Sequence, residues 1–396
     1  MSTLKVDNIR HNNATSDAIT MASDGTCTAK LTSIGGGGLS HRNLIINGAM
    51  NVAQRGVTST NTGYQTVDRF HCGAGNVNEN PTFAQVDVAS GTTPYTLGFR
   101  KALKITNGNQ TTLDTGDEIN IVYNIEAQDL ITSGWNYKSS SSFATWSFWI
   151  KSSVAQNFRG YIRTYDNTAT GYAFETGNLS ANTWTKIVRT IPGNSGLDID
   201  NDNGTGLQIR LLAYIGTAYT DNSTPTHQWV TYNSSARTPD NTSTWYQTDD
   251  ATLEITGYQF EVGDTATSFE HISYGEELLR CQRYCMKWWN HGEPNNNHSR
   301  FPPGYYQNST TGVFFLFHSV PMRATDGRTL THNVGTIENM TGGGSGNNLS
   351  IMTDGSSNVI TPIQLNGLSG VTPLSIFIPR IGSGQTNWYI IVSSEI

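Results

Sequence analysis

Apolar residues recur at every second position in short runs along most of the chain, and polar or glycine-rich stretches separate these runs. Such a period of two is typical of a strand that buries one of its faces. In residues 144–151 (ATWSFWIK), Trp146, Phe148 and Ile150 fall on one face and Trp149 falls on the other. Similar runs, spaced as in a β-sandwich, occupy residues 83–88, 102–105, 118–125, 158–165, 184–191, 206–215 and 252–262.

Each predicted sheet must cover its apolar face, so the runs predict two antiparallel sheets packed as a jelly roll over residues 43–275.

After this region the spacing of apolar residues changes from a period of two to that of a helix. Glu276 and Glu277 open a stretch in which Leu278, Leu279, Gln282, Tyr284 and Cys285 recur at helical spacing. Acidic residues in the first turn suit the helix dipole. The pattern predicts a short helix that links the jelly roll to a second β-domain.

That second domain is expected over residues 276–396 and is again all-β. The strands predicted in it cover residues 313–319 (VFFLFHS), with 322–324 as an extension, then 373–379 (PLSIFIP) and 388–392 (WYIIV), and a Gly/Ser/Asn-rich hairpin region spans 341–348. The last two runs are so apolar that they must be covered. We expect neighbouring copies of the chain to provide part of that cover.

Residues 1–42 contain too few apolar side chains to build a core of their own. A segment of this kind becomes ordered by packing against another surface or against symmetric copies of itself. Gly35 to Gly38 form a run of four glycines, which predicts a flexible joint between this segment and the rest of the chain.

Composition narrows the class of protein. Charged residues make up 14% of the 396 residues and aromatic residues 10%, which argues against disorder. The net charge of -7 and the scattered Lys and Arg residues argue against nucleic-acid binding. The sequence contains no run of eighteen apolar residues, so we expect no membrane insertion. It also contains no signal-peptide pattern, so we expect the protein to be made in a cytoplasm and not to be exported from it. Four dispersed cysteines predict reduced thiols rather than a disulfide framework.

Two groups of residues resemble metal ligands by type. Asp198, Asp200 and Asp202 alternate as in a calcium loop, but Asn203 stands where such a loop needs glycine, so a solvated turn is predicted instead. Zinc could be bound by a second set, consisting of Cys281, Cys285, His291 and His298. Because the Cys-x3-Cys spacing is unusual for zinc, we predict instead that the two cysteines are buried on a helix and that the two histidines lie on the surface. We therefore expect no metal and no other cofactor.

Catalytic signatures are missing from the sequence. It contains no G-x-S-x-G, H-E-x-x-H or Walker motif. Asp249 and Asp250 are adjacent, so in a strand their carboxylates would point to opposite faces and could not act as a glycosidase pair. Glu276 and Glu277 are explained by the helix start. The chain is predicted not to be an enzyme.

Aromatic residues in polar loops are the remaining candidates for function. Aromatic rings flanked by Asn, Asp and Gln suit the apolar faces and hydroxyls of sugars. One cluster, in residues 220–248, contains Trp229, Tyr232, Trp245 and Tyr246. A second, at the start of the C-terminal domain, contains Trp288, Trp289, His291, Phe301, Tyr305 and Tyr306. Burial in a core or subunit interface is the competing explanation for each ring. The second cluster is the one predicted to contribute to a receptor surface.

Eight short motifs stand out along the chain: STLKVDNI (2–9), NLIINGAM (43–50), QRG (54–56), DRF (68–70), QFEVG (259–263), SFE (268–270), SYGEEL (273–278) and CQRY (281–284). They resemble motifs of phage tail-fibre and related virion proteins that contain a jelly-roll domain. The resemblance frames most of residues 1–290 and is loose beyond them. The predicted jelly roll is also similar to the carbohydrate-binding modules of secreted glycosidases.

The resemblance implies a tail fibre or receptor-binding protein that attaches a bacteriophage virion to host surface glycans by multivalent adhesion. It would be made in the host cytoplasm, assemble as a homotrimer, and reside in the virion tail. Residues 1–42 would contact other tail proteins, and the C-terminal domain would meet host polysaccharide. Two rival hypotheses stay open: a structural virion component, such as a tail connector or capsid decoration, and a tailspike that depolymerises polysaccharide.

Overall fold

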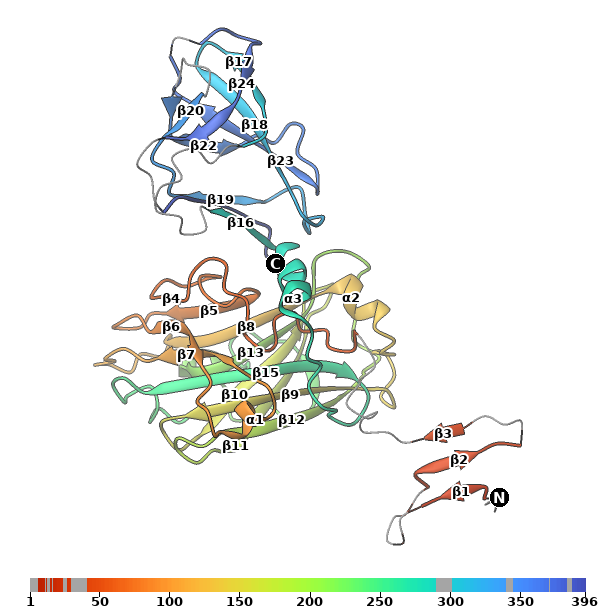
Figure 1. Cartoon of the computed structure of the whole chain (residues 1–396). Coiled ribbons are helices and arrows are strands. Elements are labelled where there is room, and N and C mark those ends of the chain that lie inside the picture. The colour runs from red at the N-terminus through yellow and green to blue at the C-terminus, as the bar shows by residue number, and fades with distance from the viewer. Residues whose placement is uncertain are drawn as a thin grey trace.

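The computed structural model describes most of the chain after residue 40. The described residues are 6–10, 12, 15, 17–23, 27–29, 41–289, 301–339, 345–369, 371–382 and 387–396. The fold is all-β with short helices, as the alternation predicted. Figure 1 shows a large lower unit and a smaller upper one, joined near α3 (Tyr274–Gln282), with the C-terminus at the junction. Among the described helices, none has the length and apolar character needed to cross a membrane.

Two six-stranded antiparallel sheets form the jelly roll. The first sheet has the order β14 (Trp229–Thr231), β11 (Thr170–Asn178), β10 (Asn157–Thr164), β13 (Thr205–Ile215), β8 (Glu118–Glu126) and β5 (Phe70–Gly75). The second sheet has the order β12 (Thr185–Pro192), β9 (Phe143–Ser152), β15 (Thr252–Val262), β7 (Lys101–Thr106), β6 (Thr82–Asp87) and β4 (Thr58–Ser59). The short elements α1 (Thr93–Thr96), α2 (Ala127–Thr132) and the 3-10 turn at Thr217–Tyr219 lie in the connections.

The inner faces of the two sheets enclose the main core. Trp146, Phe148 and Ile150 are fully buried in it, and Trp149 lies half-buried on the opposite face, which confirms the alternation predicted for β9. Strands β5 and β11 were not predicted. Each contains two glycines, whose lack of a side chain weakens the period-two pattern on which the prediction depends.

The predicted helix is present, but it begins at Tyr274 instead of Glu276 and ends earlier than expected. Ser273 caps α3 by accepting a hydrogen bond from the Glu276 N–H at 3.2 Å. The helix ends at Gln282, so Tyr284 and Cys285 lie outside it. Cys285 instead begins β16 (Cys285–Trp289), because its backbone pairs with Ser393 near the other end of the domain. The helical spacing of these two residues was therefore misleading.

In the described part of the C-terminal domain, the strands form three small sheets. Their strand orders are β16–β26 (Tyr389–Ser393)–β19 (Thr329–His332), then β22 (Asn348–Ile351)–β23 (Ile360–Asn366)–β18 (Thr311–Phe317)–β17 (Gly304–Asn308)–β24 (Ile376–Phe377), and finally β21 (Ser345–Gly346)–β20 (Ile337–Asn339)–β25 (Pro379–Ile381). Residues 322–324, predicted to extend a strand, are irregular: Met322 is buried in the core and its N–H donates to Asn358 O at 2.7 Å.

The apolar C-terminal strands bury their core faces within a single chain. Phe377, Ile390 and Val392 are fully buried in the core of this domain. The expectation that neighbouring copies cover these strands is therefore wrong for these side chains. Apolar groups do remain on the surface of the domain, most clearly Leu374, which is 82% exposed, and Ile376 in β24.

The described part of the N-terminal segment forms a small antiparallel sheet. It comprises β1 (Asn8–Ile9), β2 (Ile19–Met21) and β3 (Cys27–Ala29), with Asn8 opposite Thr20 and Thr20 opposite Thr28. Val6 and Ile9 are exposed. Gly35 to Gly38, predicted as a joint, lie outside the described residues.

Candidate functional site

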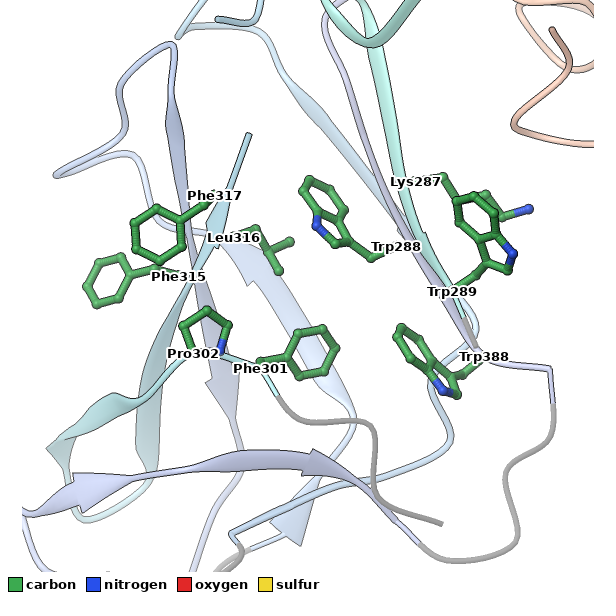
Figure 2. Close-up of a pocket in the computed structure, with 9 residues that line it drawn as sticks. All are labelled: Lys287, Trp288, Trp289, Phe301, Pro302, Phe315, Leu316, Phe317 and Trp388. Atoms are coloured by element: carbon green, nitrogen blue, oxygen red, sulfur yellow. The ribbon is translucent and has the colours of Figure 1, made fainter. Parts of the chain in front are cut away.

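A pocket of about 290 Å³ opens between β16 and β18 in the C-terminal domain (Figure 2). Nine residues line it: Lys287, Trp288, Trp289, Phe301, Pro302, Phe315, Leu316, Phe317 and Trp388. The lining is dominated by aromatic rings, three of them indoles. Lys287 is the one charged side chain among these nine described residues, so no carboxylate from them faces the cavity.

The position of β16 at the edge of its sheet places two of the indoles. Adjacent residues in a strand point to opposite faces. Figure 2 accordingly shows Trp288 on the side of β16 that faces Leu316, and Trp289 on the other side beside Lys287. Trp288 packs against the core, whereas Trp289 is 39% exposed, with the Lys287 ammonium 5.8 Å from its ring centroid. Trp289 is therefore the more accessible of the two for a ligand.

Phe301 and Trp388 form the inner part of the pocket. Their ring centroids are 5.6 Å apart in an edge-on arrangement, and Phe301 also lies 5.1 Å from Phe314 in the core. The Trp388 indole N–H is buried and has no hydrogen-bond partner in the described part of the chain. Rings held by core contacts keep their positions when the pocket is empty, so little order has to be created on binding.

Trp288, Trp289 and Phe301 were predicted as candidate receptor contacts, and all three line the pocket, with Trp288 and Trp289 on opposite sides of β16. Of the others in that cluster, Tyr306 is buried with its ring 5.1 Å from Phe377, and Tyr305 is half-buried on β17 without lining the pocket. His291 lies outside the described residues. Sequence reasoning missed Lys287, Trp388 and the β18 residues. In VFFLF, large apolar residues stand at consecutive positions, which was a signal that both faces of β18 are apolar.

The first aromatic cluster is largely buried, so the prediction that Trp229, Trp245 and Tyr246 contact a glycan is wrong. Trp245 and Tyr246 are 0% exposed, and Trp229 is also buried. The Trp245 indole donates to Thr252 O at 3.1 Å, the Trp229 indole donates to Pro192 O at 2.7 Å, and the Tyr246 hydroxyl donates to Asp117 Oδ2 at 2.8 Å. Burial and the Asp117 carboxylate raise the pKa of Tyr246, so its hydroxyl stays protonated. These side chains fill the sandwich core and do not face a glycan.

Two of the three aspartates considered for calcium, Asp198 and Asp202, accept hydrogen bonds from protein groups. Asp198 accepts hydrogen bonds from Lys138 Nζ at 3.3 Å and Asn167 Nδ2 at 2.7 Å. Asp202 Oδ1 accepts the Gly204 N–H at 2.8 Å, which closes its own turn. Asp200 donates its backbone N–H to Asp166 Oδ2 at 2.9 Å. Within the described residues, no three His, Cys, Asp or Glu side chains are grouped as metal ligands.

The cysteines considered for zinc are buried apart from solvent. Cys281 on α3 and Cys285 on β16 are both fully buried and free of disulfide bonds, as is Cys72. Burial raises the pKa of the Cys281 and Cys285 thiols above its ordinary value, which favours the protonated form over the thiolate that zinc requires. His291 and His298 lie outside the described residues.

The motifs that resemble virion proteins mostly hold the fold together. Asn47 accepts the Val52 N–H and donates to the Asp68 carbonyl, and its own N–H donates to Glu277 on α3. Glu126 Oε2 accepts a hydrogen bond from Arg283 at 2.9 Å. These contacts connect segments that are far apart in the sequence, so Asn47 and Arg283 stabilise the packing of the jelly roll against α3 and the residues that follow it.

Comparisons with known proteins describe the fold only. No family model matches the chain, and no curated protein matches it. Similar solved structures include a CBM4 protein (14% identity, TM-score 0.28, covering 55% of this chain and 98% of that one). They also include the Clostridium thermocellum family 11 carbohydrate-binding module in complex with a mixed-linked tetrasaccharide (12% identity, TM-score 0.23, covering 54% of this chain and 98% of that one). A third is the enzymatically active domain of bacteriophage CBA120 tailspike protein 4 (10% identity, TM-score 0.28, covering 56% of this chain and 22% of that one). These values describe a loose likeness and assign no ligand or activity to this chain.

Proposed function

We propose that this protein is a receptor-binding component of a phage tail, most simply a tail fibre, that attaches the virion to glycans on the host surface. The observation that carries the glycan proposal is the pocket with Trp288, Trp289 and Phe301 at the edge of the C-terminal domain. The motif resemblance in residues 1–290 supports the virion assignment.

The chemistry of the pocket favours binding over cleavage. Exposed indole faces pack against the C–H faces of sugar rings, and Lys287 can donate hydrogen bonds to hydroxyl or carboxylate oxygens. Glycoside hydrolysis needs two carboxyl groups on opposite sides of the scissile bond. None of the nine described lining residues supplies one. In this proposal the protein holds a polysaccharide without cutting it.

Adhesion through such a site needs several copies. One small aromatic pocket gives weak binding, whereas copies linked in a homotrimer, repeated over several fibres, bind with much higher avidity. In this proposal the residues 1–42 attach the fibre to other tail proteins and the C-terminal domain points toward the host.

The test is binding of the purified full chain to host and non-host cells, with its oligomeric mass measured in parallel. Trp289→Ala is expected to lower cell binding at least about tenfold, since exposed aromatic anchors dominate such interfaces. Trp289→Phe, which keeps a ring, should retain most of it.

Three results would overturn the proposal. Unchanged binding by folded Trp289→Ala would exclude the pocket. Binding to tail proteins but to no susceptible host cell would favour a structural virion component. Release of new reducing ends from host polysaccharide would identify a depolymerase.

A further inference from the structure

A second pocket, of about 320 Å³, lies on the jelly roll and is formed by β9, β12, β15 and the segments before β7 and after β15. In β9 the inward-facing residues are Trp146, Phe148 and Ile150, so Ser147 and Trp149 point outward from the second sheet. The outer face of a solvated sheet is normally polar. Here it carries a satellite aromatic cluster instead, with Trp149 and Phe269 packed around Phe99.

A bulge in β15 makes room for this cluster. The register between β15 and β9 shifts between Thr256 and Gln259, and Gly257 within the shift has φ of +67°. A Cβ at Gly257 would lie 2.7 Å from Phe99 Cζ and 3.2 Å from Trp149 Cδ1. Glycine accommodates both the backbone conformation and the two rings, so a side chain at this position would displace the rings that line the pocket.

The wall of the pocket is a loop pinned to β15. Thr267 donates its N–H to Glu261 Oε1 at 2.9 Å and its hydroxyl to Glu261 Oε2 at 2.6 Å. Gln259 Nε2 donates to Ser268 O at 3.3 Å, and Gln259 Oε1 accepts the Glu270 N–H at 2.8 Å. Gln259 and Glu261 belong to the QFEVG motif, which thus has a defined role. A wall fixed in this way gives a preformed pocket, as ligand sites usually are.

Three rings of the cluster hold one another in place. The centroids of Phe99, Phe269 and His271 lie 4.9 to 5.2 Å from one another. His271 Nε2 is 2.9 Å from Leu97 O. Because a carbonyl oxygen only accepts, Nε2 carries a proton, and in the neutral ring Nδ1 is left as an acceptor for a ligand hydroxyl.

The charge of the pocket indicates which ligands fit. Lys186, on β12 directly opposite Trp149, is exposed at the rim. It is the one formally charged residue among the described residues that line the pocket, and Ser147 adds a hydroxyl. A cation on the residue opposite an indole, with no carboxylate from the lining, complements a sugar ring that bears a carboxylate.

We propose that this outer face is a second saccharide site, separate from the C-terminal pocket, and that it takes acidic sugars of the uronic acid class. A uronate ring would stack on Trp149, its carboxylate would contact Lys186, and a hydroxyl would donate to His271. This site does not depend on the function proposed for the C-terminal pocket.

The experiment is calorimetric titration of the full chain with oligogalacturonate and oligoalginate, and with fully methyl-esterified oligogalacturonate as the neutral match. The acidic oligosaccharides are expected to bind, and the ester to bind at least about tenfold more weakly. Lys186→Met keeps the aliphatic part of the side chain and removes its positive charge. It is expected to lower the affinity for acidic sugars about tenfold. Lys138→Met, which alters a lysine outside the pocket, should change nothing. Trp149→Ala should abolish binding, and Trp149→Phe should keep part of it.

Several outcomes would overturn the inference. These are equal binding of the acid and its ester, no binding of either uronate, or unchanged affinity in Lys186→Met. Loss of uronate binding in Trp289→Ala with retention in Trp149→Ala would assign the ligand to the C-terminal pocket. Conversely, uronate binding that survives in Trp289→Ala supports the second site even if cell adhesion through the first pocket fails its own test.

Discussion

Arg69 and Glu395 form an ion pair across 326 positions of the sequence, with Arg69 Nη1 and Glu395 Oε2 2.6 Å apart. Arg69 is 1% exposed. Its other terminal nitrogen donates to Asn124 O at 2.7 Å, and its guanidinium lies 3.4 Å from the ring centroid of Tyr284. Arg55 Nη2 donates to the second Glu395 oxygen at 3.1 Å. The last residues of the chain are thereby attached to the jelly roll, and the two domains share one polar junction.

Replacing Glu395 should weaken this junction. Glu395→Gln removes the carboxylate and leaves two buried guanidinium groups without their full partner, so we expect a loss of about 2–4 kcal/mol in the free energy of unfolding. Chemical denaturation followed by tryptophan fluorescence measures the change. The matched control is Asp87→Asn, which breaks the exposed pair between Asp87 and Lys101 and should cost less than about 0.5 kcal/mol. Equal losses in the two variants would contradict a role for the buried pair.

Stability should fall in acid through Glu126. Burial acts to raise the pKa of Glu126, but hydrogen bonds from Arg283 and Tyr284 outweigh it and hold the pKa below its ordinary value of 4.5. A carboxyl group whose pKa is lower in the folded state stabilises the protein above the ordinary pKa, and this contribution is lost as the pH falls through the folded value. Thermal unfolding of the native protein and Glu126→Gln should therefore differ most near neutral pH and converge in acid. A pH-independent difference would refute the assignment.

Gly257→Ala should destabilise the jelly roll by two separate effects. The positive φ disfavours alanine, and the new Cβ would overlap Phe99. Gly177→Ala is the matched control, since Gly177 has φ of +77° with no atom within 4 Å of the added Cβ. We expect Gly257→Ala to cost at least about 1 kcal/mol more than Gly177→Ala. Denaturation midpoints of the two variants check this. Similar midpoints would show that Phe99 moves away from the added Cβ without a loss of stability.

Trp245 and Trp289 should behave in opposite ways when each is replaced by alanine. Trp245 fills the jelly-roll core, so Trp245→Ala is expected to cost about 3–5 kcal/mol while the folded fraction keeps its affinity for cells. Trp289 is partly exposed, so Trp289→Ala should cost less than about 1 kcal/mol and lose affinity. Stability and cell binding measured on the same samples separate the two roles. Lost affinity in folded Trp245→Ala would restore the first aromatic cluster as a candidate site.

Local patterns predicted much of the fold. The alternation in β9 and β15 identified both strands and the inward face of β9, because burial of one sheet face imposes a period of two whatever the partner sheet is. The two acidic residues Glu276 and Glu277 located the first turn of α3, which begins at Tyr274. The end of α3 could not be found in this way, since Cys285 joins β16 through pairing with Ser393, which is distant in the sequence.

Candidate site residues were predicted less well, for a related reason. Trp245 and Trp289 both stand in polar stretches, and nothing next to either distinguishes a ring that closes a core from one that faces solvent. The difference depends on segments far away: Trp245 is enclosed by the two sheets, and Trp289 lies on a sheet edge. Trp388 joins the pocket from the end of the chain for the same reason.

The amino-acid sequence by itself determined that the chain is all-β, which faces of its main strands are apolar, and where its linking helix begins, because these depend on residues a few positions apart. Only the tertiary structure decided which aromatic rings share a pocket, that the core-facing side chains of the C-terminal strands are covered within one chain, and that Glu395 pairs with Arg69. Exposure and ion pairing are set by neighbours in space, and in a β-sandwich those neighbours come from distant parts of the sequence.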